Sequence, residues 1–182
     1  MALGRFLGGT GGPSRPAPGS PGDTATVRRI VGELDALPVD RARFLAAFAY
    51  ILTRAAAADL EISDVESRVI EELVVEHGGL SAAQALLVAQ IARSQSLLFG
   101  GTEDYLVTRQ FRELSTEDER LALLRCCYLV GAADDSITAV ESDTLQQIAK
   151  ELDLERASVN AIRHEFEPKL AAIQAMLRLQ SG

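Results

Sequence analysis

The chain has 182 residues, of which 47% are hydrophobic, 24% are charged and 5% are aromatic, and its formal net charge is −8. This composition is typical of an ordinary globular protein with one sizeable core, or with two small ones. The negative charge argues against nucleic acid as the main partner, because phosphate groups bind clustered Lys and Arg, and it permits basic protein partners or cations. No stretch of the sequence approaches the roughly 18 uninterrupted apolar residues of a membrane span.

The first 23 residues are predicted to be a disordered terminus. Residues 8–22 form a linker rich in Gly, Pro and Ser, which cannot bury enough apolar surface to order itself. Ahead of it, the apolar residues of Met1–Gly9 are a candidate for a short docking peptide, with a disordered terminus as the favoured interpretation. This apolar run is too short for a signal peptide and Ala2 excludes an N-myristoyl site, so we expect a cytoplasmic protein.

The folded domain is predicted to cover residues 24–182, and its first half contains three helices. Val27, Ile30, Val31 and Leu34 recur at helical spacing and predict a first helix that ends before Pro38. The next helix, from about Val39 to Ala58, is apolar or small on nearly every side and therefore belongs in the middle of a bundle. A third helix over Asp64–His77 should end at Gly78-Gly79, since glycine adopts the left-handed conformation that ends helices. The side chains expected to face the core are Phe44, Leu45, Phe48, Ile51, Leu52, Val69, Ile70, Leu73 and Val74.

Further helices follow in the second half of the chain. Ser81 is the predicted N-cap of a helix that carries Leu86, Leu87, Ile91, Leu97 and Leu98, and Thr102–Leu114 is a weaker helical segment. Ser115 and Asp118 resemble a capping arrangement at the start of a second central helix. The last helices are expected around Leu145–Leu152, over Arg156–Phe166 and from Pro168 onward. No segment alternates apolar and polar residues as a half-buried strand would, so we predict an all-α domain of about 7–9 helices.

One ten-residue stretch occurs twice. Residues 58–67 read A-D-L-E-I-S-D-V-E-S and residues 133–142 read A-D-D-S-I-T-A-V-E-S, and the copies lie 133 − 58 = 75 residues apart. Each copy lies where a very apolar segment ends and a new helical pattern begins, so the repeat predicts two pseudo-symmetric halves. It places four acids at matching positions, namely Asp59, Glu66, Asp134 and Glu141.

Helix capping explains most of this motif. Ser63-x-x-Glu66 and Thr138-x-x-Glu141 have the spacing of a capping box, which contributes about 1 kcal/mol per helix. Capping leaves Asp59 and Asp134 unexplained, because a negative charge is unfavourable at the C-terminal end of the preceding helix. The aspartate, a loop carbonyl and the glutamate seven residues later all offer oxygen atoms. Such oxygen atoms are the type of ligand that a hard cation such as Ca²⁺ or Mg²⁺ prefers. Capping alone and capping with ion binding both remain open.

The paired segments A-A-D-x-x-I-x-x-x-E, at Ala57–Glu66 and Ala132–Glu141, resemble the TerB-like family, named after a bacterial tellurite-resistance protein. The resemblance extends over about Arg41–Leu154. It implies an all-helical single domain with two pseudo-symmetric halves and a role in stress and tellurite responses. It also implies links to membrane-associated complexes, and related domains are fused to J-domain co-chaperones. The divalent-metal face that the resemblance implies would consist of Asp59, Glu66, Asp134 and Glu141.

The sequence departs from the commoner form of this motif at one position. In that form a glycine follows the aspartate, whereas this chain has Leu60 in the first copy and Asp135 in the second. The loops are not EF-hands either, because alanine and valine occupy the first ligand positions that such a loop needs. Any ion site is therefore expected to be weak, rich in water, or shared between the two copies.

Enzyme motifs are absent from the sequence. Its only histidines, His77 and His164, lack the glutamate three residues earlier that a ferritin-like di-metal site needs. Cys126 and Cys127 are adjacent and are interpreted as small core residues of a reduced compartment. We therefore expect a non-enzymatic module that binds a divalent cation and protein partners. The alternative is a metal-independent helical scaffold, either co-chaperone-like or an adaptor of a membrane complex, and the sequence leaves the oligomeric state open.

Overall fold

The computed structural model describes residues 32, 36–59 and 62–180. Within these residues the regular structure consists of eight α-helices, labelled α2 to α9, and two 3-10 turns, without a β-strand. This confirms the all-α prediction and the predicted number of helices. The expected disordered terminus 1–23 lies outside the described residues, and so does the expected helix Val27–Leu34 apart from Gly32.

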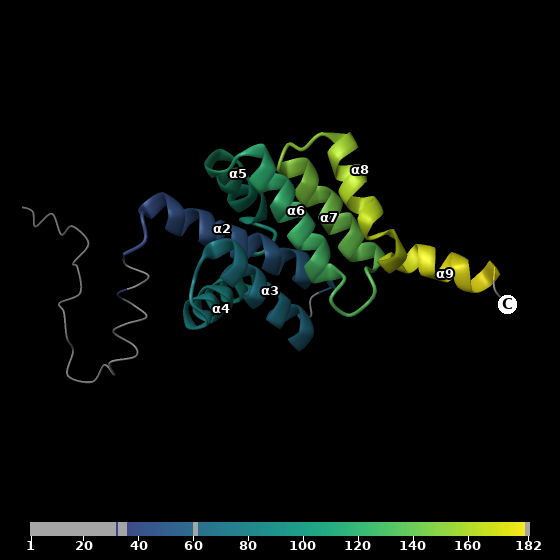
Figure 1. The fold of residues 1–182 in the computed structure, drawn as a ribbon, viewed down its shortest axis with the longest axis horizontal. Helices are drawn as coiled ribbons and strands as arrows, with labels where there is room; N and C mark the ends of the chain where they lie inside the picture. Colours follow the sequence, from purple (N-terminus) through teal and green to yellow (C-terminus); the bar gives the residue numbers. More distant parts are fainter. Residues whose placement is uncertain (1–31, 33–35, 60–61, 181–182) are drawn as a thin grey trace, which may run out of the picture.

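Figure 1 shows α2 at the centre of the bundle, with α5 and α6 on one side, α3 and α4 on the other, and α9 projecting at the C-terminal end. The helices are α2 (Val39–Ala56), α3 (Asp64–Gly78), α4 (Ala82–Phe99), α5 (Asp104–Leu114), α6 (Glu117–Gly131), α7 (Ala139–Glu151), α8 (Arg156–Glu165) and α9 (Ala171–Gln180). The 3-10 turns cover Ala57–Asp59 and Glu167–Lys169. Among these helices, none is both long and apolar enough to cross a membrane.

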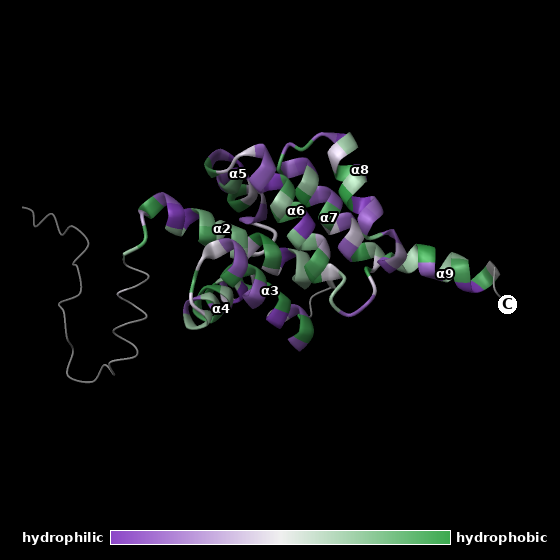
Figure 2. Ribbon diagram, in the orientation of Figure 1, coloured by the Kyte–Doolittle hydropathy of each residue, from purple (hydrophilic) through white to green (hydrophobic). Residues whose placement is uncertain are grey.

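Helix α2 is the core of the fold. It packs against α3, α4, α5, α6 and α7, and apolar residues colour most of its length in Figure 2. Its predicted core residues Phe44, Leu45, Phe48, Ile51 and Leu52 are all buried, which confirms its central position. This burial follows from the amino-acid composition of α2. A helix that is apolar on every side removes its whole surface from water only when other helices surround it.

Side-chain caps begin four of the described helices, α3, α4, α6 and α7. Ser63 and Thr138 each form the predicted capping box, and Ser81 caps α4 as predicted and also forms a capping box with Gln84. Gly79 ends α3 in the left-handed conformation with φ 62°. The predicted cap at Ser115 is wrong: the N-cap of α6 is Thr116, whose backbone N–H donates to Glu119 Oε2 at 2.8 Å. Glu119 at the third helical position reaches back to the cap. Ser115 instead donates its hydroxyl to the carbonyl of Phe111 at the end of α5.

The structure shows that α4 is oriented differently from what its leucines suggest. Its large apolar side chains are exposed, namely Leu86, Leu87, Ile91, Leu97 and Leu98. The residues that α4 buries include Ala85, Ala89 and Ala92, and it packs against α2 and α3. Small side chains at a helix contact allow a short interaxial distance. Close packing against the alanine-rich α2 therefore leaves the leucines at the surface.

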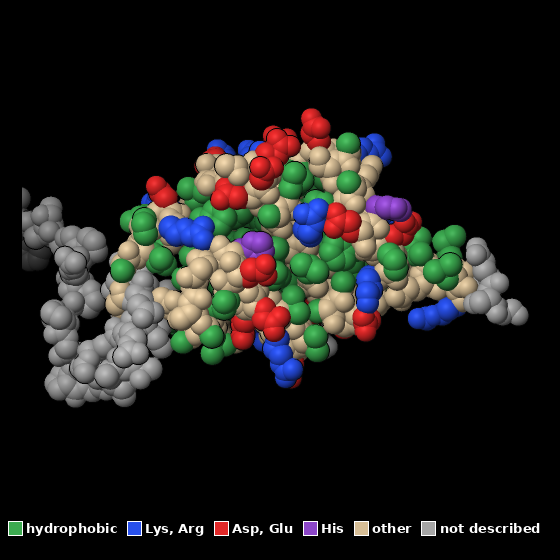
Figure 3. Space-filling model, in the orientation of Figure 1, with side chains coloured by type: hydrophobic (Ala, Val, Ile, Leu, Met, Phe, Trp, Pro, Cys, Tyr) green, Lys and Arg blue, Asp and Glu red, His purple; other side chains and the backbone are tan. Residues whose placement is uncertain are grey.

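The C-terminal helix begins later than predicted. Pro168 lies within a 3-10 turn, and α9 starts at Ala171. The segment before α9 is fixed to the second motif loop, because Ile137 N–H donates to Lys169 O at 2.7 Å and Ala171 N–H donates to Ile137 O at 2.9 Å. Beyond this point α9 leaves the body of the molecule, and apolar side chains lie along its upper side in Figure 3.

Candidate functional site

The two copies of the motif occupy equivalent joints between helices. The first joint connects α2, which ends at Ala56, to α3, which begins at Asp64, and the second connects α6 and α7 at Gly131 and Ala139. Both pairs of helix ends are 75 residues apart (131 − 56 and 139 − 64). The elements therefore recur at the spacing of the sequence repeat. The pseudo-twofold axis itself stays a prediction.

Both motif glutamates act as capping residues. Ser63 N–H donates to Glu66 Oε2 at 2.7 Å, and Thr138 N–H donates to Glu141 Oε2 at the same distance. In return the backbone N–H of each glutamate donates to the hydroxyl oxygen of its cap residue at 3.2 Å. Glu66 is only 7% exposed and Glu141 only 5%, so the capping interpretation of both glutamates is confirmed.

The aspartates occupy the turns before these caps. Asp59 ends the 3-10 turn that follows α2, and its side chain lies outside the described part of the structure. Asp134 is exposed, and its Oδ1 accepts a hydrogen bond from Ser136 N–H at 3.2 Å, which closes the turn. The carboxylate of Asp134, which capping left unexplained, therefore has a local role in closing this turn.

Asp135 occupies the position where the commoner motif has glycine. Its φ is 74°, so this residue adopts the left-handed conformation that glycine would favour. Aspartate tolerates that region better than most residues because its short side chain can bond locally. Here the Asp135 carboxylate pairs with Lys169, which lies in the turn before α9. The loop conformation is thus kept without the glycine, while Leu60, the equivalent residue in the first copy, lies outside the described residues.

The fold brings acids of the two joints within electrostatic range. Burial raises the pKa of Glu66, the negative charges of Glu141 and Asp134 raise it further, and hydrogen bonds from Ser63 oppose the rise. Glu66 belongs to the first joint, whereas Glu141 and Asp134 belong to the second. Among the described side chains, however, no three His, Cys, Asp or Glu meet as a group that could hold a metal ion.

Residues 44–164 match the family model described as "Tellurite resistance protein TerB". The chain belongs to the TerB family. The match includes both joints and the four acids of the motif, which confirms the resemblance seen in the sequence. No curated protein and no solved structure matched the chain.

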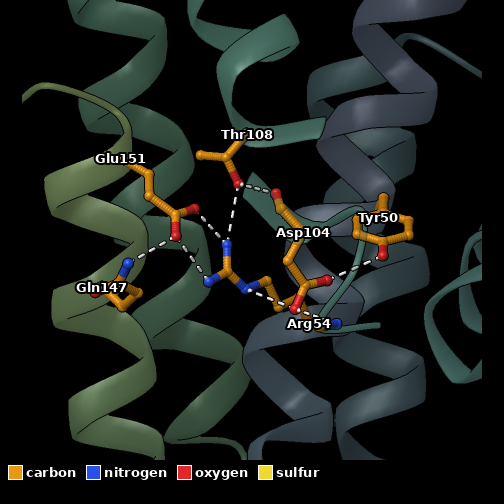
Figure 4. Close-up of polar contacts among 7 residues, drawn as sticks. Tyr50, Arg54, Asp104, Thr108, Gln147 and Glu151 are labelled. Atoms are coloured by element: carbon orange, nitrogen blue, oxygen red, sulfur yellow. Dashed lines mark hydrogen bonds and ion pairs between the residues drawn. The ribbon is translucent and has the colours of Figure 1, made fainter. Parts of the chain in front are cut away.

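The TerB domain also contains a buried polar network that sequence analysis missed. Figure 4 shows Arg54 of α2 at its centre, surrounded by Tyr50, Asp104, Thr108, Gln147 and Glu151. Arg54 donates to both carboxylate oxygens of Glu151, at 2.6 and 3.1 Å, and lies 3.4 Å from Asp104. The side chains of Arg54 and Glu151 are 11% and 6% exposed, so the network joins α2, α5 and α7 inside the bundle.

Two features of this network bear on its charges. Burial raises the pKa of Glu151, but the hydrogen bonds from Arg54 and Gln147 and the charge of Arg54 outweigh that effect and hold the pKa below its usual value. Tyr50 donates to Asp104 Oδ1 at 2.9 Å, and the pKa of this tyrosine is raised mainly by burial and then by Asp104. Glu151 is therefore ionised beside Arg54 at neutral pH.

A cavity of about 650 Å³ connects this network to the first joint. It is lined by Arg54 and Asp104, by Ala57 and Ala58 of the 3-10 turn after α2, and by residues of α7 such as Val140. One sequence signal pointed to this region. Arg54 is the single charged residue between Phe44 and Ala58, and a charge in such an apolar helix needs a buried partner.

Glu66→Gln should raise the melting temperature at neutral pH in the absence of divalent cations. Glutamine can keep the capping box, since in this TerB domain Ser81 N–H donates to Gln84 Oε1 at 2.7 Å. The pKa of Glu66 is raised in the folded state. Its stabilising contribution is therefore complete at pH values below the unfolded pKa and is lost as the pH rises through the folded pKa.

The advantage of Glu66→Gln should consequently be largest at neutral pH and shrink as the solution is acidified. Thermal melts of both proteins over an acid-to-neutral series, with chelator present, measure this difference. If the difference in melting temperature between the variant and the wild type did not change with pH, the assignment of a raised pKa to Glu66 would be contradicted. The cap formed by Ser81 and Gln84 provides an internal reference. The variant Gln84→Glu makes the opposite change in charge there, at a cap that is separate from the joints.

Proposed function

We propose that this TerB domain is a non-enzymatic stress-response module that binds a divalent cation between its two acidic joints and interacts with protein partners. The observation that carries the proposal is the equivalent placement of the motif acids in two joints between helices, with Glu66 and Glu141 buried as caps and Asp134 exposed in its turn. The negative charges of Glu141 and Asp134 add to the rise in the pKa of Glu66, and a divalent cation bound at the joints would offset this unfavourable charge. Tellurite resistance, a cytoplasmic location and partners in membrane-associated complexes are parts of this proposal that rest on the family relationship.

The described residues fit such an ion only through an open, hydrated site. Each capping box engages Oε2 of its glutamate, and no compact group of three ligands exists among the described side chains. The proposed ligands are Asp59 and Asp134, with Glu66 and Glu141 supporting them, and water completes the shell. Ca²⁺ accepts such irregular, water-rich oxygen coordination, while Mg²⁺ retains several of its waters. Weak binding is expected in both cases.

A titration of the chelator-treated protein with Ca²⁺, Mg²⁺ and Zn²⁺ tests this function. An ion that binds only the folded state stabilises it by about 2.7 kcal/mol at one hundred times its Kd, so the melting temperature of the wild type should rise with ion concentration. Asp59→Asn/Asp134→Asn should abolish the rise. Asp40→Asn/Glu113→Gln is the matched control, because it also removes two negative charges, from side chains that are 80% and 59% exposed on α2 and α5.

The alternative function is a metal-independent scaffold. It is favoured by the exposed apolar side chains of α4 and α9, among them Leu98 at 71% and Leu179 at 85% exposure, since exposed apolar patches often mark protein interfaces. In that case none of the three ions changes the melting temperature of the wild type. Equal shifts in the wild type and in the joint variant would also favour the scaffold, because the ion would then bind elsewhere.

A further inference from the structure

Helix α4 presents an almost uncharged surface to the solvent. It lies at the outer edge of the bundle in Figure 1 and packs against α2 and α3. Arg93 is the single charged residue among its 18 residues, although 24% of the whole chain is charged. Its large apolar side chains are 37–71% exposed, namely Leu86, Leu87, Ile91, Leu97, Leu98 and Phe99. An exposed apolar helix face of this kind is typical of a surface that contacts another molecule.

The exposed residues of α4 are arranged symmetrically about Ala92, which is only 6% exposed. Three pairs of exposed residues lie at equal distances on either side of it, namely Leu86 and Leu98, Leu87 and Leu97, and Gln90 and Ser94. At 3.6 residues per turn, all six lie within about 60° of the direction opposite Ala92. The face therefore has the same pattern of apolar and polar residues in both chain directions. A twofold contact between two identical antiparallel helices requires this property, because each copy contributes the same patch.

An antiparallel pair of α4 helices centred on Ala92 would place like groups together. Each end of the contact would contain four leucines, namely Leu86 and Leu87 of one copy with Leu97 and Leu98 of the other. In the middle, Gln90 of each copy would lie beside Ser94 of the other. The Ser94 hydroxyl donates to Gln90 O of its own helix at 3.0 Å, so its oxygen remains an acceptor for a glutamine amide. The contact would extend from residue 86 to residue 98, or about 18 Å of helix.

The charge of the chain favours a second copy as the partner. Two molecules that each carry a net charge of −8 repel, so their contact must keep carboxylates apart. Helix α4 contains no Asp or Glu, and Arg93 donates to Ser67 of α3 in its own chain at 3.5 Å. A basic partner would find no carboxylate on this helix, whereas an identical uncharged face needs no counter-charge.

We propose that two copies of this chain associate through antiparallel α4 helices, with the twofold axis at the level of Ala92. One helix pair makes a small interface, and interfaces of less than about 1,200 Å² generally belong to transient complexes. The dimer is therefore weak, with a dissociation constant of micromolar order. Helix α4 carries none of the four motif acids, so this dimer does not depend on the cation proposed at the joints.

Sedimentation equilibrium of the full-length protein, with chelator present, tests this association. The mass of the wild type should rise from 19.5 kDa toward twice that value as the concentration passes through the micromolar range. Leu87→Glu and Leu97→Lys should each stay at the monomer mass, because each introduces a charge at both ends of the apolar contact. Both side chains are exposed in the monomer, at 37% and 63%, so each variant keeps its fold. Leu179→Glu is the matched control on α9, where the side chain is 85% exposed, and it should dimerise like the wild type.

An equimolar mixture of the two variants tests the antiparallel direction. The introduced glutamate of one chain then lies beside the introduced lysine of the other, and the opposite end keeps its four leucines. The mixture should therefore form the dimer that neither variant forms alone. A wild type that remains at 19.5 kDa would overturn the proposal, because α4 would then be covered by a different protein or by another part of the chain. So would undiminished dimers of either variant alone, loss of the dimer in Leu179→Glu, or a mixture that remains monomeric.

Discussion

Arg54→Ala should destabilise the protein by about 3–5 kcal/mol, the typical cost of leaving one partner of a buried ion pair unpaired. Glu151 would keep its charge although its side chain is only 6% exposed. Thr108 would lose a hydrogen bond from Arg54, and Asp104 would lose its counter-charge. Domains of this kind are stable by about 5–15 kcal/mol in total, so the loss is a large part of the whole. Urea unfolding followed by circular dichroism gives the free energy directly.

The matched control is Arg109→Ala. Arg109 pairs with Glu113 at 3.0 Å, but the two side chains are 55% and 59% exposed, and exposed pairs contribute about 0–1 kcal/mol. Equal losses in the two variants would show that Arg54 is not a buried partner. Arg54→Met/Glu151→Met removes both charges together and should recover much of the loss, because a buried pair replaced by apolar residues is often neutral.

Phe111→Ala should also destabilise the protein by about 3–5 kcal/mol, the usual cost of removing a buried phenylalanine ring. Phe111 is fully buried, and its ring centroid lies 4.9 Å from that of Phe44 and 6.4 Å from that of Phe48. Apart from Phe111, only Thr108 is buried among the residues of α5, so the variant should loosen this helix in particular. Loss of helical signal at α5 by NMR, together with the unfolding free energy, measures both effects.

Leu106→Ala is the control on the same helix. Leu106 is 57% exposed, and surface substitutions usually change stability by no more than about 0.5 kcal/mol. A large loss in Leu106→Ala with a small one in Phe111→Ala would show that α5 is packed through its other face. Because α5 also carries Asp104 and Thr108, the Phe111 variant should weaken the hydrogen bonds around Arg54 as well.

Helix ends could be predicted from the sequence wherever they depend on neighbouring residues. The capping boxes at Ser63 and Thr138 and the left-handed Gly79 are local features, so their residue types and spacing were sufficient. The error at Ser115 has the same origin, since the glutamate three residues after Thr116 is the better capping partner. The TerB relationship was also visible, because its motif is a run of residues close together in the chain.

Contacts between distant residues could not be predicted in this way. The partners of Arg54 lie 50 and 97 residues further along the chain (Asp104 and Glu151), and no local pattern connects them. The orientation of α4 depends likewise on the small side chains of another helix, so its leucines alone gave no indication of which face is buried. For the acidic joints, the sequence supplied Glu66 and Glu141 as caps, while their electrostatic coupling appears only in three dimensions.

The position of α2 has a consequence for how the domain folds. This one helix contacts α3 and α4 as well as α6 and α7, so it supplies core to the helices that carry both copies of the motif. A fragment that begins after α2 would lack the surface on which its remaining helices assemble. We therefore expect the helices on both sides of α2 to unfold together in one cooperative transition.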